Sequence, residues 1–552
     1  MKKNHRTNLI LEDYDSEFSY KKSKSNLNIS FNRVAFIFFI FFIIFLIFSL
    51  KAVYFGTIQK KNKISHTAES DYRASIIDSS GNILAKTVIT TNIGVNPNLV
   101  IDKKRLLINL KLIFPNKDFN IIKKKMDGKK FFYVEKQIQQ EKLEEILLLG
   151  DKSIITEEKI SRIYPQESLF SHIIGQIDDN NNGISGIEKY YDYELKKNNE
   201  PIELTVDTAV QYLIKQELLK SKDIFNNIGS AALLMNLNNG EILSLISLPD
   251  FNLNKRENLI DLNYTNKITK GVYELGSVFK TLTLAAGFEN NIVEPESEFE
   301  GLKKKIYCAG NIISEYDEKL PSKLTTEQIL VRSSNIGSVR IAQKIGLEKY
   351  KKFLEKIGIL NKIEFDIEEV GQPHNFRWGK CKLATSSFGH GITTTPIQLA
   401  KAYSIISNGG YEINPTLIKK KNYGKKKILK SEVSNKINPI LRKVVSTKEG
   451  TASFANISGY EVAGKTGTAD KVKNGVYTKD KINTFVSIFP SSNPKFLLLV
   501  LLDEPKSNKE YVYTLSTGQK YKGNWRNTAG WTTVLISGQI IKSIGPILAT
   551  KY

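Results

Sequence analysis

Cysteine is scarce in this chain, since Cys308 and Cys381 are the only two among 552 residues. Two cysteines are too few for the disulfide framework of small secreted domains, and they lack the paired spacing of a metal site. They would be able to pair if this part of the chain lies outside the cytoplasm, but two separate buried thiols fit the sequence equally well. The sequence therefore excludes a disulfide scaffold and leaves the state of these two thiols open.

Acidic residues are outnumbered, because 80 Lys and Arg against 57 Asp and Glu give a formal net charge of +23. Such an excess is compatible with nucleic-acid binding. The basic residues, however, are scattered among Asn and Ile instead of alternating with aromatics, which is typical of a composition biased toward Lys, Asn and Ile. We therefore expect no nucleic-acid partner, and an anionic membrane or cell-wall surface is the alternative.

Long apolar runs are also rare, with one exception near the N-terminus. Residues 34–50 read VAFIFFIFFIIFLIFSL without a charge, and AVYFG follows Lys51. A helix of roughly 20 such residues crosses a bilayer core of about 30 Å. A cleaved signal peptide is disfavoured because a polar tail precedes the run and no small-x-small cleavage site accompanies it. We predict a transmembrane anchor, whose nearly equal basic flanks do not settle its orientation.

The rest of the chain shows no second run of this kind and no repeat of solenoid period. Residues 73–93 read as short strands around turns, with Gly and Asn in residues 79–82 for the chain reversal. Residues 102–160 are charged and helical in pattern, and Gly150 stands where a helix ends. The polar stretch KKNNEPI at 196–202 predicts a domain boundary.

Beyond this boundary, strands flank a helical cluster. LTVDTAVQYLIKQELLK (204–220) reads as a strand and then a helix capped by Asp207 or Thr208. Residues 230–250 read as a hairpin with an Asn-Asn-Gly turn. Helical runs dominate residues 277–405, and strands return at 460–469, 483–490 and 496–505. Strands at both ends predict an α+β fold in which helices cover a sheet.

A serine–lysine pair is the first candidate for chemistry. In YELGSVFK, Ser277 stands three residues before Lys280, although Ser19 and Ser492 begin the same pattern. Gly276 precedes the pair and helical periodicity follows it, so we predict that Ser277 opens a helix and shares one face with Lys280. A serine hydroxyl needs a neighbouring base to act as a nucleophile, and a helix N-terminus favours the negative charge that develops.

Two further clusters follow in order, SSN at 333–335 and KTGT at 465–468, the second entering a predicted strand. Ser-x-Asn also begins at Ser80 and Ser491, so the ordered set is more specific than any of its members. With this set the chain resembles the penicillin-binding proteins and serine β-lactamases.

More closely, the chain resembles a class B penicillin-binding protein, a single-span peptidoglycan transpeptidase. YRASIIDSSGNILA (72–85) is similar to the motif that opens the family's pedestal domain. RIYPQESLFSHIIGQID (162–178) and GISGIEKYYDYEL (183–195) are similar to its Arg-x-Tyr-Pro and Gly-Ile-Glu elements. FGHGITTTPIQLAKAYSIISNGG (388–410) is similar to the transpeptidase domain, and NTAGWTTVLISGQII (527–541) resembles the closing segment of the cell-division branch in α-proteobacteria.

The sequence departs from the family pattern at a few positions. Ala74 replaces a glycine and Ser79 an arginine in the first motif, and Leu275 replaces the commoner proline before the serine–lysine pair. Thr532 and Thr533 stand where small alanines are usual. These changes put local geometry in question, but they remove no catalytic group.

The resemblance implies an α+β architecture with a single transmembrane helix, an elongated mixed pedestal and a transpeptidase domain whose antiparallel sheet is covered by helices, as in serine β-lactamases. The expected organisation is a cytoplasmic tail (1–33), an anchor (34–55), a periplasmic pedestal of the dimerisation type (56–200) and a transpeptidase domain (201–552). Because cross-linkable peptidoglycan lies outside the inner membrane, this chemistry implies a cytoplasmic N-terminus and a periplasmic catalytic domain.

The resemblance also implies a mechanism in which a serine attacks the D-alanyl-D-alanine bond of a stem peptide and an amine of a second stem peptide takes the acyl group. No metal or organic cofactor is implied. Burial and the nearby Lys465 cation are expected to lower the pKa of Lys280 so that it can accept a proton. The implied site comprises catalytic Ser277, Lys280, Ser333, Asn335 and Lys465, substrate-binding Thr466, Gly467 and Thr468, and an oxyanion hole of the backbone N–H groups of Ser277 and Thr468.

The implied partners are peptidoglycan stem peptides, β-lactam antibiotics, a polytopic septal glycosyltransferase and other division proteins. A septal role is favoured over an elongation role in the lateral wall by the short pedestal and the TAGW ending. A β-lactamase or antibiotic sensor needs neither a pedestal nor an anchor, and a non-enzymatic scaffold has no use for an intact site.

Overall fold

The computed structural model describes residues 26–57, 72–138, 140–255, 264–379, 381–420, 424, 426–473, 475–515, 517–523 and 526–552. They belong to two units, residues 1–71 and 72–552. The first contains helix α2 (Asn26–Thr57), whose segment Arg33–Val53 has the length and hydropathy of a membrane span, with none of it buried. This is the form expected of a bilayer-spanning anchor. Most of the predicted tail, residues 1–25, lies outside the described residues.

A second helix has the length and composition of a membrane span. It covers residues 529–551, but most of its apolar stretch is buried inside the second unit. The segment ends in helix α18 (Thr533–Lys551), whose Val534, Ile536 and Ile540 are fully buried. It is therefore a core helix of the globular part.

The second unit begins with a five-stranded mixed sheet. Its strand order is β3-β2-β1-β5, with β4 also paired to β2, and α4, α5 and α6 pack at its far end around Leu106, Leu110 and Met126. The bounds are β1 Ile76–Ile77, β2 Ile83–Val95, β3 Phe132–Ile138, β4 Ile154–Ile163, β5 Ile202–Glu203, α4 Lys103–Ile113, α5 Phe119–Met126 and α6 Gln140–Leu147.

The structure confirms the strands predicted in residues 73–93 and corrects the helical interpretation of residues 102–160. Helices α4, α5 and α6 and the left-handed Gly150 confirm the prediction, whereas residues 132–138 and 154–160 are strands. Both strands carry charged side chains on exposed positions, such as Lys136 in β3 and Glu158 in β4. Lys and Glu favour helices in exposed segments, but here pairing with β2 outweighs that preference.

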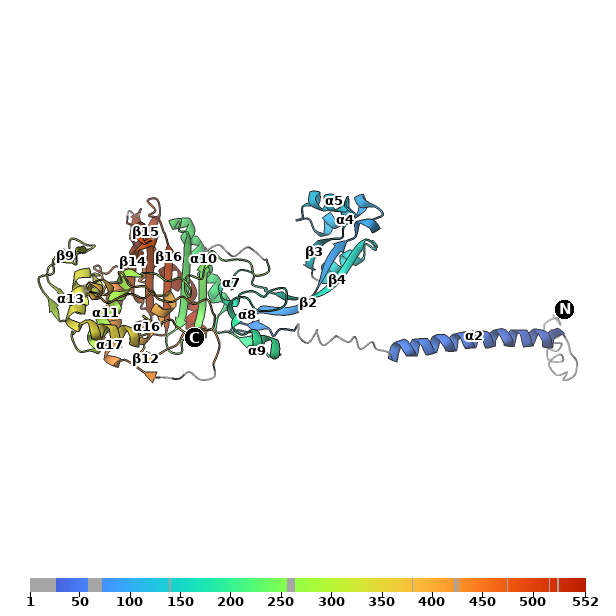
Figure 1. Ribbon diagram of the computed structural model, residues 1–552, viewed down its shortest axis with the longest axis horizontal. Coiled ribbons are helices and arrows are strands. Elements are labelled where there is room, and N and C mark those ends of the chain that lie inside the picture. The colour runs from blue at the N-terminus through green and yellow to red at the C-terminus, as the bar shows by residue number, and fades with distance from the viewer. Residues whose placement is uncertain are drawn as a thin grey trace, which may run out of the picture. The chain divides into compact units, whose positions relative to one another are not determined.

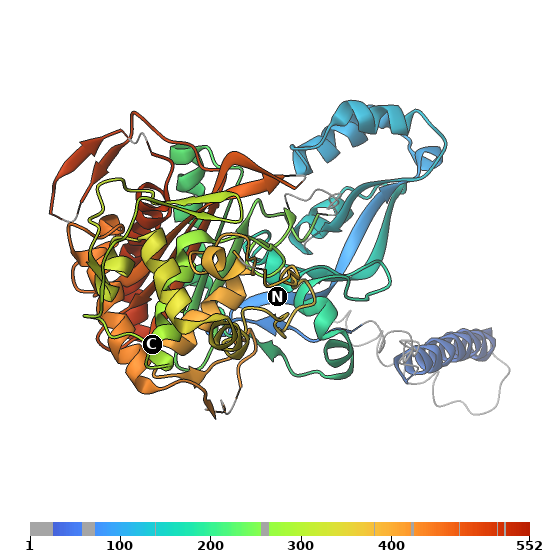
Figure 2. The same cartoon turned by 60° about the vertical axis from the view of Figure 1, so that its left-hand side comes forward.

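The larger part of the second unit is built on a second sheet, which is antiparallel throughout with the order β14-β15-β16-β6-β7. Helices α10 and α18 cover one face, and α11, α16 and α17 belong to the helical group on the other (Figure 1). Figure 2 shows this yellow-to-orange group in front of the red strands. The bounds are β6 Gly229–Asn236, β7 Ile242–Leu248, β14 Ala463–Lys473, β15 Val476–Phe489, β16 Phe496–Asp503, α10 Thr208–Phe225, α11 Phe279–Glu289, α16 Pro396–Ser407 and α17 Ser431–Ser446.

These elements confirm the α+β arrangement expected from the sequence, including the cap and the hairpin. Asp207 Oδ1 accepts hydrogen bonds from the backbone N–H groups of Ala209 and Val210, so Asp207 caps α10. Gly240, at φ +79°, turns the β6–β7 hairpin. The smaller elements are α7 Ser171–Ile174, α8 Gly186–Tyr190, α9 Asp192–Lys197, β8 Glu298–Phe299, β9 Lys305–Cys308, β10 Asn311–Ser314, β11 Leu324–Thr325, α12 Thr326–Val331, α13 Asn335–Ile345, α14 Leu347–Lys356, α15 Lys382–Ser386, β12 Tyr411–Glu412, β13 Lys426–Lys427, β17 Val512–Thr514 and β18 Lys520–Lys522.

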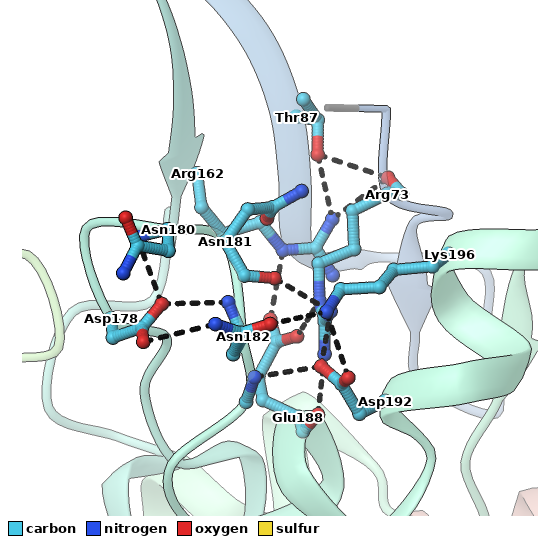
Figure 3. Close-up of polar contacts among 11 residues, drawn as sticks. Arg73, Thr87, Arg162, Asp178, Asn180, Asn181, Asn182, Glu188, Asp192 and Lys196 are labelled. Carbon is cyan, nitrogen blue, oxygen red and sulfur yellow. Dashed lines mark hydrogen bonds and ion pairs between the residues drawn. The ribbon is translucent and has the colours of Figure 1, made fainter. Parts of the chain in front are cut away.

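A buried ionic network fastens the base of the first sheet. Arg73 Nε lies 2.5 Å from Glu188 Oε2, and Arg162 Nε lies 2.8 Å from Glu188 Oε1 (Figure 3). Arg73 Nη1 lies 2.7 Å from Asp192 Oδ1. The side chains of Arg73 and Glu188 are fully buried. Charges at this depth are tolerated only when paired, so this network unites the three segments that resembled the family's pedestal motifs.

Asp78 joins the first sheet to the start of helix α10, which covers the second sheet. Its Oδ1 accepts from the backbone N–H groups of Ser80 and Asn82, at 2.9 and 2.8 Å, and its Oδ2 accepts from the Thr208 hydroxyl at 2.5 Å. Burial raises the pKa of Asp78, but the hydrogen bonds from Thr208 and Asn82 outweigh it and hold the pKa below its ordinary value. Asp78 is therefore a turn and packing residue at the start of α10.

Candidate active site

Ser277 lies in a single 3-10 turn, Gly276–Val278, and α11 begins directly after it at Phe279. The predicted helix is thus present, but it starts two residues later than the sequence pattern indicated. Gly276 has φ +61°, and a β-carbon there would lie 2.5 Å from the carbonyl oxygen of Thr468. Only glycine allows this approach, which brings the Ser277 turn against β14.

Three predicted residues meet at one oxygen atom. Lys280 Nζ and Lys465 Nζ each lie 3.0 Å from the hydroxyl oxygen of Ser333. Lys280 also donates to the Ser333 carbonyl at 2.6 Å, and Lys465 donates to the Thr466 carbonyl at 3.1 Å. The Nζ groups of both lysines donate to the lone pairs of this oxygen, so the hydroxyl proton of Ser333 remains available for donation.

Both lysines are almost completely buried, at 1% exposure for Lys280 and 0% for Lys465. Burial lowers the pKa of Lys280 to about 7, against a smaller raising effect of Glu315. Burial, followed by the charge of Lys280, holds the pKa of Lys465 well below its ordinary value. Two buried cations that share one hydrogen-bond partner disfavour each other's protonation. One of the two lysines can therefore lose its proton near physiological pH and act as a neutral amine.

Ser333 itself has an uncommon backbone conformation, with φ +59°. A non-glycine residue pays on the order of 1–3 kcal/mol for such a position, and such residues cluster at functional sites. Ser334 follows as the N-cap of α13, accepting from Gly337 N at 2.9 Å. The Asn335 side chain donates to the Ser314 carbonyl at 2.8 Å, which fixes its amide beside the Ser333 turn.

The KTGT residues lie on β14, which is an edge strand of the second sheet among the residues that the structure describes. A β-carbon at Gly467 would lie 2.2 Å from the Leu275 carbonyl oxygen, so this glycine is also required for the close contact with the Ser277 turn. The Thr466 hydroxyl bonds the Thr451 hydroxyl at 2.8 Å, and the Thr468 hydroxyl accepts from Ala529 N at 3.0 Å. The structure therefore brings all three predicted clusters together.

Two features of this site were not found from the sequence. Glu315 accepts hydrogen bonds from the Ser334 hydroxyl at 2.6 Å and from Asn335 N at 2.7 Å. Cys308 and Cys381 form a disulfide, with their Cα atoms 5.7 Å apart, which resolves the question that the sequence left open. Glu315 lies in a charged, exposed loop that contains other acidic residues, so the sequence does not distinguish it as a residue of the site.

The acylation rate should depend on pH through the buried lysine. A protonated Lys280 cannot accept the proton of a serine hydroxyl, so acylation should rise with pH through the Lys280 pKa of about 7 and level off above it. We expect a loss of about tenfold per pH unit on the acid side. Stopped-flow rates of acylation by a chromogenic cephalosporin between about pH 5 and pH 9 would measure this, and a flat profile through neutrality would contradict it.

Comparison with known proteins places this geometry in a family. Residues 69–222 match the penicillin-binding protein dimerisation domain, and residues 230–523 match the penicillin-binding protein transpeptidase domain. The boundary at residues 200 and 201 stays a prediction.

Two curated relatives illustrate the similarity. The probable peptidoglycan D,D-transpeptidase FtsI of Caulobacter vibrioides is 29% identical over 87% of this chain and 82% of its own length. Stage V sporulation protein D of Bacillus subtilis is 29% identical over 80% of this chain and 76% of its own length.

A solved structure has the same fold. Penicillin-binding protein 3 of Mycobacterium tuberculosis, complexed with aztreonam, superposes with a TM-score of 0.66 and 19% identity over 87% of this chain and 96% of that one. Its fold agrees with the helix-covered antiparallel sheet described above. Because the transpeptidase match alone spans more than half of the sequence, the chain belongs to the penicillin-binding protein transpeptidase family, as its motifs indicated.

Proposed function

We propose that this chain is a peptidoglycan D,D-transpeptidase that forms its acyl-enzyme on Ser277 and is inhibited there by β-lactams. The observation that carries the proposal is the Ser333 hydroxyl oxygen, which lies 3.0 Å from both Lys280 and Lys465. This arrangement links a base of lowered pKa to a proton relay beside the Ser277 turn. Membership of the transpeptidase family supports the same chemistry.

In the first half-reaction, Ser277 Oγ attacks the carbonyl carbon between the two terminal D-alanines. Neutral Lys280 accepts the hydroxyl proton. As the C–N bond breaks, the Ser333 hydroxyl passes a proton to the departing D-alanine amine and regains one from the lysine pair. In the second half-reaction, the amine of a neighbouring stem peptide attacks the ester and loses its proton along the same route, which frees Ser277.

The terminal carboxylate of the stem peptide is bound by side chains of β14. Thr468 Oγ1 accepts a hydrogen bond from Ala529 N, so its own proton is available for the terminal carboxylate of the stem peptide. Thr466 and Lys465 complete this carboxylate site, and Gly467 keeps the strand against the Ser277 turn. The backbone N–H groups of Ser277 and Thr468 form the oxyanion hole, where losing one donor typically costs about 10² to 10³ in rate. Asn335 binds the substrate's amide.

The cellular setting follows from the chemistry and the anchor. Helix α2 is placed in the inner membrane with a cytoplasmic N-terminus, because the lipid-linked substrate lies on the periplasmic side. A septal role is favoured by the Caulobacter vibrioides relative named FtsI, and the sporulation relative shows that similar chains serve other processes. In the septal role, the partner that we infer is a polytopic glycosyltransferase. Accumulation of a tagged copy at midcell would support the septal role, and accumulation along the side wall would support the elongation alternative.

The enzyme itself is tested by locating the acyl group. Full-length protein in detergent, treated with benzylpenicillin, should gain the mass of one penicilloyl group, and peptide mapping should place it on Ser277. The adduct should persist for many minutes. No adduct, or an adduct on another residue, would contradict the proposal and favour the scaffold reading. Release within seconds would instead favour a β-lactamase, because such an enzyme hydrolyses its penicilloyl ester rapidly.

A further inference from the structure

A small hairpin beside the active site has little support of its own. Strands β9 and β10 pair only with each other among the described strands. Tyr307 is 76% exposed and Ile312 is 58% exposed, whereas Ile313 is buried against Val339 of α13 and Ala384 of α15. An isolated two-stranded hairpin is marginal in water, so other contacts must hold this one in place.

The disulfide supplies one such contact. Cys308 ends β9, and Cys381 immediately precedes α15, so the bridge ties the hairpin to that helix. The chain after α15 reaches Gly389, where a β-carbon would lie 2.1 Å from the Gly276 carbonyl oxygen. The bridge therefore ties the hairpin to the segment that backs the Ser277 turn.

At its other end the hairpin holds the Ser333 turn. The carboxylate of Glu315, one residue beyond β10, accepts from the Ser334 hydroxyl at 2.6 Å, from Asn335 N at 2.7 Å and from Ile336 N at 3.0 Å. The neighbouring Ser314 carbonyl accepts from the Asn335 side chain at 2.8 Å. A carboxylate here satisfies N–H groups that the first turn of a helix leaves without partners.

We propose that Glu315 is a positioning residue for the transpeptidase reaction, and that the hairpin tethered by the Cys308–Cys381 bridge is the arm that presents it. Glu315 fixes the start of α13, and through it the left-handed Ser333 whose hydroxyl lies between the two lysines. This inference rests on the proposed function, because it assumes that Ser333 and Lys280 act in acylation.

Glu315 also acts on the base through its charge. The charged groups that face Lys280 are Lys465 on β14 and Glu315 on the arm. Glu315 opposes the effect of burial and raises the Lys280 pKa. Removing its charge should therefore move the midpoint of the acylation pH profile to lower pH, which a purely structural role would not do.

Glu315→Gln tests the inference with little change in size. We expect full-length protein in detergent to be acylated by benzylpenicillin about tenfold more slowly at pH 8, the size of effect typical of losing a helix cap. We also expect a lower pH midpoint and a melting temperature that falls by no more than about 2–4 °C, as the loss of a helix cap allows. Glu315→Asp should keep the wild-type midpoint, because it keeps the charge. Glu318→Gln, an exposed change in the same loop, is the matched control and should behave as wild type.

The results distinguish a failure of the Glu315 inference from a failure of the proposed function. A Glu315→Gln variant with wild-type rate and midpoint would overturn the inference, and so would a slower variant with a lower melting temperature and an unshifted midpoint. If wild-type protein forms no acyl-enzyme on Ser277, the proposed function fails first, whatever Glu315 does.

A double-mutant cycle tests the tether. Cys308→Ser combined with Cys381→Ser should slow acylation by a fewfold, and Glu315→Gln should then cost less than it does with the bridge intact, because residues that act through one element are not additive. If Glu315→Gln costs the same with and without the bridge, the bridge has no part in presenting Glu315.

Discussion

A Lys280→Met variant should be acylated by benzylpenicillin about 10² to 10⁴ times more slowly than wild type, the range that a general base contributes. Methionine has nearly the length of lysine and suits a site that is 1% exposed, so the fold should tolerate it. The variant loses the amine that we propose accepts the Ser277 proton, and it loses the donor that lies 3.0 Å from the Ser333 hydroxyl oxygen. The measurement is the second-order rate constant of labelling by a fluorescent penicillin.

The matched control is another partly buried lysine outside the cluster. Lys401 on α16 pairs with Glu412 at 3.7 Å, and burial lowers its pKa as well. Lys401→Met should leave the labelling rate within about twofold of wild type, because Lys401 bonds Glu412 and Asn414 and no residue of the cluster. Near-wild-type labelling of Lys280→Met would show that the base lies elsewhere, with Lys465 the next candidate.

The second large effect concerns stability. Replacing Glu188 with alanine should lower the free energy of unfolding by about 3–5 kcal/mol, because it leaves two buried guanidinium groups without their shared carboxylate. Arg73 and Arg162 each bond a different oxygen of Glu188, and their side chains are 0% and 2% exposed (Figure 3). Urea denaturation followed by circular dichroism would report the loss as an earlier transition.

An exposed ion pair nearby provides the comparison. Glu368 lies 2.7 Å from Lys189, but both side chains are more than 40% exposed. Glu368→Ala should leave the urea transition unchanged within error, since water already screens this pair. Equal transitions for Glu188→Ala and wild type would mean that the buried network does not stabilise the fold.

Much of the site could be predicted because its chemistry is local in sequence. Ser277 and Lys280 are three residues apart, and glycines mark the places where the backbones of the Ser277 turn and β14 approach. The order of the three clusters then indicated that Ser333 and Lys465 belong to the same site as Ser277, although Lys465 lies nearly 190 residues further along the chain. Asp207 was found as a helix cap for the same reason, since a cap is defined by its nearest neighbours.

What escaped prediction depends on distant contacts. Glu315 matters because of the turn that packs against it, and nothing in a lysine-rich loop distinguishes it from Glu318. The bridge between Cys308 and Cys381 depends on how the hairpin lies over α15, which spacing does not reveal. Residues 132–138 read as a helix because their charges suit one, and only their pairing with β2 makes them a strand.

The strand order of the second sheet has a consequence for biosynthesis. β6 pairs with β7, its immediate successor, and on its other side with β16, where Asn236 meets Phe496. The apolar hairpin therefore emerges from the ribosome long before its second neighbour exists. At about 5–20 residues per second, the delay is on the order of tens of seconds. During that interval an unpaired strand edge is open to aggregation, so this segment is a site where a chaperone that covers bare strands would act.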